Sequence, residues 1–305
     1  MTEIDTSNKT LFKYLGFTFG IGYVIQIFVW LVNNMENGSA KLILSGAAQM
    51  ITACMMFVPL LAVLVSGQKL KGMGWKPVFK GNIWAFLFSW FGPAVLTAIG
   101  AVLYFVIFPS HFDVSGAYLV ENGQEAALEQ METMGVTYGQ QMLISSISTI
   151  AYVPLLNMIF AVGEEAGWRG YMYPALKERF GRVGGSILGG IIWGMWHWPM
   201  ILLTGYEYGK DYKGFPIVGM VSFCVCTVFL GALCDYVYEK SKCIWYPAIL
   251  HGAFNGAATI PLALAAPSVV AATRLLGPAP NGYIAGLPIY IVGAVILWKA
   301  KEKVK

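Results

Sequence analysis

The sequence predicts an all-α integral membrane protein with about eight transmembrane helices. Of its 305 residues, 57% are hydrophobic and only 12% are charged, whereas a soluble domain has about a quarter of its residues charged. A helix needs about 20 apolar residues to cross the hydrocarbon of a bilayer. Apolar runs of this kind occupy residues 11–32, 41–65, 82–108, 145–175, 184–207, 215–238, 244–263 and 283–298. We therefore expect a single polytopic membrane domain over residues 1–305.

The distribution of basic residues predicts the orientation of the chain. Sixteen of the 20 Lys and Arg residues lie on the side of the two ends and the even-numbered loops, counting Lys13 and Arg169, which fall inside the first and fourth apolar runs. Basic residues gather on the cytoplasmic side of a membrane protein. We therefore expect both termini and loops 66–81, 176–183 and 239–243 to be cytoplasmic, and loop 109–140, which has no Lys or Arg, to be translocated. The net charge of +4 is then an orientation signal in a multi-pass protein of the cell membrane, and no basic patch indicates a nucleic-acid partner.

The fourth apolar run contains two adjacent carboxylates, in the stretch 163-GEEAGWRGYMYPALKERFGR-182. Only three charges occur in 164–175, so we expect the helix to continue past Val162, from about 150 to 175, with Glu164 near its middle. Glu165 and Arg169 are four residues apart, which favours an ion pair on one helix face. Glu164 is rotated by about 100° from Glu165. The spacing therefore predicts that Glu165 is paired and Glu164 is left free.

Other polar side chains are predicted to lie at the same membrane depth. The fifth run contains 191-IIWGMWHWPM-200, with His197 one turn after Trp193, and the seventh contains 246-YPAILHGAFNGA-257, with His251 and Asn255 four residues apart. Taken singly, a histidine can bond a backbone carbonyl, an asparagine can join two helices, and a glutamate can belong to a charge cluster in water. Charged residues inside a membrane are costly and usually functional. Their conjunction with Glu164 therefore favours a polar catalytic cavity within the bundle.

These motifs resemble those of a known family. In chain order they are Glu164-Glu165-x-x-x-Arg169, Trp193-x-x-x-His197 and His251-x-x-x-Asn255. The order and spacing are similar to those of the CPBP family of intramembrane proteases, which includes the type II CAAX prenyl endopeptidases and bacterial bacteriocin-processing or self-immunity relatives. The resemblance covers roughly residues 145–262, and the family commonly has Phe where Trp193 stands.

The resemblance implies an endopeptidase that cleaves a membrane-associated protein or peptide. It makes Glu164 the general base, His197 its partner in holding the attacking water, and His251 with Asn255 the donors to the oxyanion. The Glu165–Arg169 pair then supports the helix. Peptide hydrolysis independently requires a base within reach of water and fixed donors aimed at the developing negative charge.

Some alternatives remain open at the level of sequence. Glu164, His197 and His251 could hold a catalytic zinc ion with one position left for water, but the chain has no HExxH motif, and we favour a site that requires no cofactor over one with Zn2+. The same three side chains could form the relay of a proton-coupled transporter. The fold could also serve a non-catalytic scaffold or immunity protein, although the presence of all three motifs argues against that role.

Overall fold

The computed structural model describes residues 4–302 and contains helices but no strand within that range. The first half of the chain forms α1 (Asn8–Asn33), α2 (Ser39–Met55), α3 (Val58–Val65), α4 (Ile83–Ile107), α5 (Ala117–Glu121) and α6 (Glu125–Thr133). The second half forms α7 (Tyr138–Gly167), α8 (Tyr173–Trp196), α9 (Trp198–Thr204), α10 (Ile217–Ser241), α11 (Trp245–Ala263), α12 (Pro267–Val270) and α13 (Leu287–Glu302). The all-α membrane architecture predicted from the sequence is therefore confirmed.

Among residues 4–302, four helical segments are long and apolar enough to cross a membrane, or up to six if the bent pairs α2–α3 and α11–α12 each count as one span. Each of the eight apolar runs falls on a helix or a helix pair. The first helix, for example, covers 8–33 where the run covers 11–32. The count of eight crossings stays a prediction.

The helix that carries the two carboxylates is longer than the sequence suggests. It begins at Tyr138 because Thr137 and Gln140 form a capping box, in which each side chain bonds the other residue's backbone N–H. It continues past Val162 through a π-helical turn, Trp168–Met172, and into α8. The chain then turns at Gly181, where φ is 71° and ψ is 171°, a conformation open to glycine. The expected continuation past Val162 is confirmed, but the expected start near residue 150 is wrong.

The helix of the fifth apolar run, 184–207, is broken at His197. His197 ends α8 and precedes α9, which has Pro199 in its first turn. Proline has no backbone N–H and its ring clashes with the preceding turn, so a helix rarely continues through it. The imidazole therefore lies at a junction between two helices.

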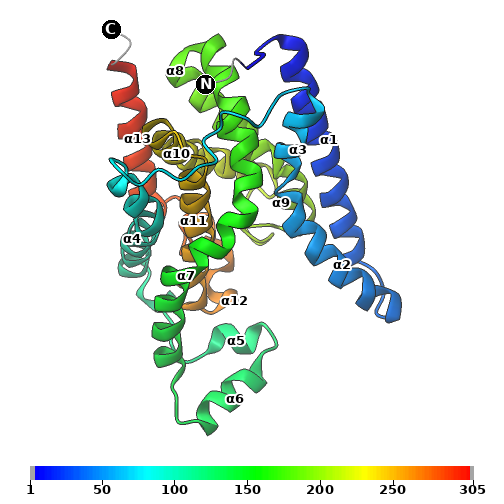
Figure 1. The fold of residues 1–305 in the computed structure, drawn as a ribbon. Helices are drawn as coiled ribbons and strands as arrows, with labels where there is room; N and C mark the ends of the chain where they lie inside the picture. The colour runs from blue at the N-terminus through cyan, green and yellow to red at the C-terminus, as the bar shows by residue number, and fades with distance from the viewer. Residues whose placement is uncertain (1–3, 303–305) are drawn as a thin grey trace.

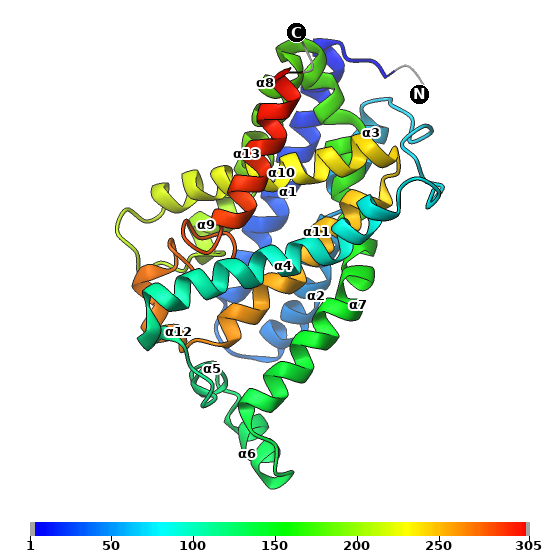
Figure 2. The ribbon, with the colours of Figure 1, turned by 90° about the vertical axis from the view of Figure 1, so that its left-hand side faces the viewer.

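Helices α7, α8, α10 and α11 form the centre of the bundle. α11 packs most extensively against α7, and α10 against α8. The contact between α8 and α10 is close because it has glycine on one side: a Cβ at Gly190 would lie 2.4 Å from Val228 Cα, and one at Gly194 would lie 2.7 Å from Cys224 Cα. α4 crosses α11 obliquely on the outside (Figure 2).

One end of the bundle gathers the loops that the sequence predicts to be cytoplasmic. The start of α1, the turn at Gly181 in α8 and the end of α13 lie together at this end, whereas α5 and α6 lie at the opposite end (Figure 1). Trp245 at the start of α11 donates to Trp75 O in loop 66–81 at 2.8 Å. Arg179 donates to Asn8 Oδ1 at 3.1 Å. The first contact joins loop 66–81 to the start of α11, and the second joins loop 176–183 to the start of α1.

Candidate active site

Glu165 forms a fully buried ion pair within the helix. Its Oε1 accepts from Arg169 Nη1 at 3.0 Å, and both side chains are 0% exposed. The guanidinium lies 4.7 Å from the centre of the Tyr173 ring and 4.5 Å from that of Trp193, distances at which a cation is attracted to the ring face. The ion pair predicted from the spacing of four residues is confirmed.

Glu164 is not free, and the prediction that it would be is wrong. Its Oε2 accepts from Trp168 Nε1 at 3.0 Å and from Trp193 Nε1 at 2.8 Å. Trp168 is four residues along the same helix, and Trp193 reaches the carboxylate from α8. Both donors are neutral indoles and both bond the same oxygen. They fix the carboxylate and leave Oε1 as the oxygen able to accept a proton.

His251 is bonded to the second carboxylate. Its Nδ1 lies 3.1 Å from Glu165 Oε1, the oxygen that also accepts from Arg169. An ionised carboxylate only accepts hydrogen bonds, so Nδ1 carries the proton of this contact. The opposite ring atom, Nε2, therefore presents a lone pair in the neutral ring and an N–H in the imidazolium. The ring packs edge-on against Trp193, with centroids 5.1 Å apart.

His197 is oriented by the backbone of its own helix. Its Nδ1 lies 3.1 Å from Trp193 O, and because a carbonyl oxygen only accepts, Nδ1 is the donor. Nε2 of the neutral ring is then a hydrogen-bond acceptor. The imidazole stacks on Tyr206, with centroids 5.9 Å apart and planes 9° apart. The ring is thereby fixed on two sides at the α8–α9 break.

A cavity of about 140 Å³, which we call the central cavity, brings the predicted residues together. Glu164, His197, His251 and Asn255 all line it. Each water in the liquid takes up about 30 Å³, so the cavity has room for a few waters. Asn255 lies one helical turn after His251 on α11 and is exposed rather than buried. Its amide is therefore accessible from the space that Glu164 borders.

Two residues of the loop after α9, Tyr206 and Glu207, also line this cavity. Neither was predicted from the sequence. Glu207 has a φ of 69°, which is unusual for a residue other than glycine, and its Oε2 accepts from Asn281 Nδ2 at 2.8 Å. Nothing in the local sequence pattern predicts that this loop returns to the cavity. The one available signal was an acidic residue ten positions after His197, at the last position of the fifth apolar run.

The donor atoms do not fit a zinc ion. Within residues 4–302, no three His, Cys, Asp or Glu side chains are grouped closely enough to hold a metal ion. The three-ligand arrangement considered from the sequence is therefore not formed, and no step of the reaction is derived through a metal.

Comparison with known proteins finds a family similarity in the central part of the chain. Residues 146–257 match the model of the family described as Rce1-like, type II CAAX prenyl endopeptidase. A CAAX prenyl protease 2 from Methanococcus maripaludis is 42% identical to this chain over 60 residues, which cover 19% of this chain and 22% of that relative. The similarity thus spans about a fifth of the curated relative. The family match includes all three motifs and lies within the predicted core of 145–262. Residues 146–257 are therefore similar to the Rce1-like family of type II CAAX prenyl endopeptidases, in agreement with the resemblance of the three motifs to CPBP intramembrane proteases.

Proposed function

We propose that this protein is an intramembrane endopeptidase that hydrolyses a peptide bond of a membrane-associated protein or peptide at the central cavity. The observation that carries the proposal is the different surroundings of the two adjacent carboxylates. Glu165 is bonded to a guanidinium and an imidazole, whereas Glu164 is bonded to two neutral indoles. Hydrogen bonds from charged donors are roughly twice as strong as those from neutral ones. Glu164 is therefore the carboxylate better able to accept a proton.

The first step is the attack of water on the scissile carbonyl. A water in the central cavity donates one proton to Glu164 Oε1 and is oriented by a second hydrogen bond to Nε2 of neutral His197. As its oxygen bonds the carbonyl carbon, the proton moves to Glu164 and the carbonyl oxygen becomes an oxyanion. A base held by fixed donors reacts without first having to reorganise.

The second step is the collapse of the tetrahedral intermediate. The Asn255 amide donates to the oxyanion, and His251 donates through Nε2–H when its ring is an imidazolium. Glu165 stabilises that charged ring through Nδ1. The C–N bond breaks as Glu164 returns its proton to the leaving nitrogen, and the products are a carboxylate and an amine. The Glu165–Arg169 pair takes no proton and serves to position His251.

The orientation of the chain forms part of the proposal. Both termini and the end of the bundle that carries the Gly181 turn face the cytoplasm, and the segment with α5 and α6 is translocated. The excess of Lys and Arg in the segments at the first end supports this orientation. Membrane-associated proteins exposed to the cytoplasm are then the substrates.

The test uses the purified full chain in lipid nanodiscs. Farnesylated and unmodified forms of a peptide with a C-terminal CAAX sequence are offered to wild type and to Glu164→Gln. Wild type is expected to cleave at least one peptide, and Glu164→Gln is expected to be inactive at an unchanged yield. Glu178→Gln, at an exposed glutamate of α8, is the matched control and should keep the wild-type rate.

A broader readout covers other substrates. Proteomes of cells that express wild type or Glu164→Gln are compared for new termini in membrane-associated proteins. Peptide cleavage by Glu164→Gln at the wild-type rate would remove Glu164 from the role of base. The endopeptidase proposal itself fails if no peptide is cleaved and the two proteomes also agree.

A further inference from the structure

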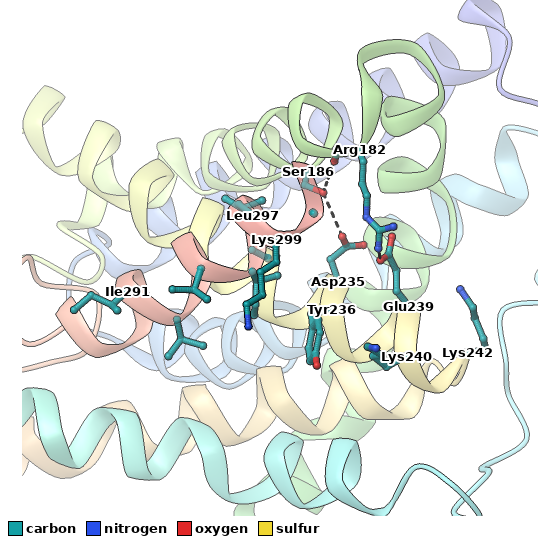
Figure 3. Close-up of a pocket in the computed structure, with 15 residues that line it drawn as sticks. Arg182, Ser186, Asp235, Tyr236, Glu239, Lys240, Lys242, Ile291, Leu297 and Lys299 are labelled. Atoms are coloured by element: carbon teal, nitrogen blue, oxygen red, sulfur yellow. Dashed lines mark hydrogen bonds and ion pairs between the residues drawn. The ribbon is translucent and has the colours of Figure 1, made fainter. Parts of the chain in front are cut away.

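A second concave site lies outside the central cavity, between α8, α10 and α13. We call it the α10–α13 groove, and its volume is about 650 Å³ (Figure 3). Its apolar wall is formed by Ile291 and Val295 of α13 and by Ala232 and Tyr236 of α10. Ile291 is 60% exposed and Val295 is 43% exposed. The groove is therefore an open apolar surface and not a part of the packed core.

The groove and the central cavity lie on opposite faces of α10. The central cavity is lined by Phe223, Cys226, Thr227 and Leu230, and the groove by Ala232, Asp235, Tyr236 and Glu239. Successive residues advance by about 100° around a helix, so the centres of the two sets are roughly 180° apart. The groove is thus separate from the site assigned to catalysis.

The two acidic side chains at the groove already have basic partners. Lys177 Nζ lies 2.5 Å from Asp235 Oδ1 and 2.9 Å from Glu239 Oε1. Arg182 pairs with the other oxygen of Glu239, and Ser186 donates to Asp235 (Figure 3). The charges of the two carboxylates are thus balanced by those of Lys177 and Arg182. No carboxylate of this cluster is left to compensate another basic residue at the groove.

Three lysines at the groove remain without an acidic partner. Lys240 and Lys242 come from the end of α10, and Lys299 comes from the last turns of α13 (Figure 3). All three are exposed, and none of them forms an ion pair with the side chains that the structure describes, those of residues 4–301. Lys240 Nζ lies 5.8 Å from the centre of the Tyr236 ring, on the apolar wall. The rim of the groove therefore carries about three uncompensated positive charges above an apolar surface.

The position of this rim along the molecule indicates the kind of ligand. Its lysines come from the ends of α10 and α13. The end of α13 lies at the same end of the bundle as the start of α1 (Figure 1), the end with the excess of Lys and Arg. Basic residues next to the cytoplasmic ends of transmembrane helices attract anionic lipid head groups, whose acyl chains extend into the apolar region. The charged rim and the apolar wall match the two parts of such a lipid.

We propose that the α10–α13 groove binds an anionic glycerophospholipid of the cytoplasmic leaflet. Its phosphate contacts Lys240, Lys242 and Lys299, and one acyl chain lies along Tyr236 and Val295. The bound lipid ties α13 to α10 at the membrane surface. No step of peptide hydrolysis depends on this site.

The test measures lipid binding to the purified full chain by native mass spectrometry and by thermal unfolding in detergent. Phosphatidylglycerol is the anionic probe and phosphatidylcholine the neutral one. Each lysine near an anionic surface contributes about 1 kcal/mol, so Lys240→Gln/Lys242→Gln/Lys299→Gln should weaken phosphatidylglycerol binding on the order of 100-fold. The matched control, Lys69→Gln/Lys76→Gln/Lys80→Gln, removes the same charge from exposed lysines of the α3–α4 loop. It should bind phosphatidylglycerol as wild type does.

A second variant keeps every charge and fills the groove. Val295→Trp is expected to abolish the stabilisation by phosphatidylglycerol while the protein remains folded. The proposal is overturned if both triple variants lose binding equally, since the effect would then come from the general positive surface. It is also overturned if phosphatidylcholine binds as tightly as phosphatidylglycerol, or if Val295→Trp binds the anionic lipid like wild type.

Discussion

Arg169→Met should destabilise the protein strongly, because it leaves the Glu165 carboxylate buried without its guanidinium. Both side chains of the pair are 0% exposed, and Glu165 Oε2 already has no partner. Removing one member of a buried pair costs about 3–5 kcal/mol. Arg169 also contacts the Tyr173 and Trp193 rings, and each such contact adds about 0.5–1 kcal/mol. We therefore expect the free energy of unfolding to fall by an amount in the upper part of the range of about 3–5 kcal/mol. The total free energy of unfolding of a protein is about 5–15 kcal/mol.

The measurement is thermal unfolding of detergent-solubilised protein, followed by size-exclusion chromatography. Arg182→Met is the matched control, because its pair with Glu239 is 39% and 24% exposed and should be worth less than about 1 kcal/mol. The double variant Glu165→Gln/Arg169→Met removes both charges and should be more stable than Arg169→Met alone. The reasoning is refuted if Arg169→Met is no less stable than Arg182→Met, or if adding Glu165→Gln deepens the loss.

Three further predictions address the site and the topology. Trp193→Phe removes a hydrogen bond to the Glu164 carboxylate, worth about 1.5–3 kcal/mol, and should lower the rate of cleavage by about ten- to 100-fold at an unchanged yield; a wild-type rate would show that the indole N–H is dispensable. Asn255→Ala should lower turnover by about two to three orders of magnitude, with substrate binding intact and no rescue by added zinc, because the amide acts only on the developing oxyanion. In a cysteine-free background, an impermeant thiol reagent should label Glu125→Cys in intact cells and Lys80→Cys only after permeabilisation, and the reverse pattern would invert the topology.

The spacing of the motifs predicted much of the site. A separation of four residues places two side chains on one helix face whatever the rest of the fold does, so the Glu165–Arg169 pair followed from the sequence. Polar groups inside a membrane are costly and usually functional, which led us to expect that Glu164, His197 and His251 share one site. They lie on different helices, and they do line one cavity.

The partners across helices could not be predicted, because they depend on the rotation of each helix about its axis. His251 meets Glu165 although 86 residues separate them, and Trp193 reaches Glu164 over 29 residues. Tertiary packing sets these rotations, and a single sequence does not record them. Glu207 is a similar case: its place at the cavity depends on the backbone of one loop, where φ is positive at Gly205, Glu207 and Gly209.

The arrangement of the chain ends constrains the number of membrane crossings. The helical segment Tyr138–Thr204, which includes the turn at Gly181 and the break at His197, has 67 residues. It would measure roughly 100 Å if it were straight, about three times the hydrocarbon thickness. The turn at Gly181 divides it into a rising and a returning part (Figure 1). The start of α1 and the end of α13 lie at the same end of the bundle, which requires an even number of crossings. Four, six and eight crossings all satisfy this parity. Of these, eight is the number that uses every apolar run, and it stays a prediction.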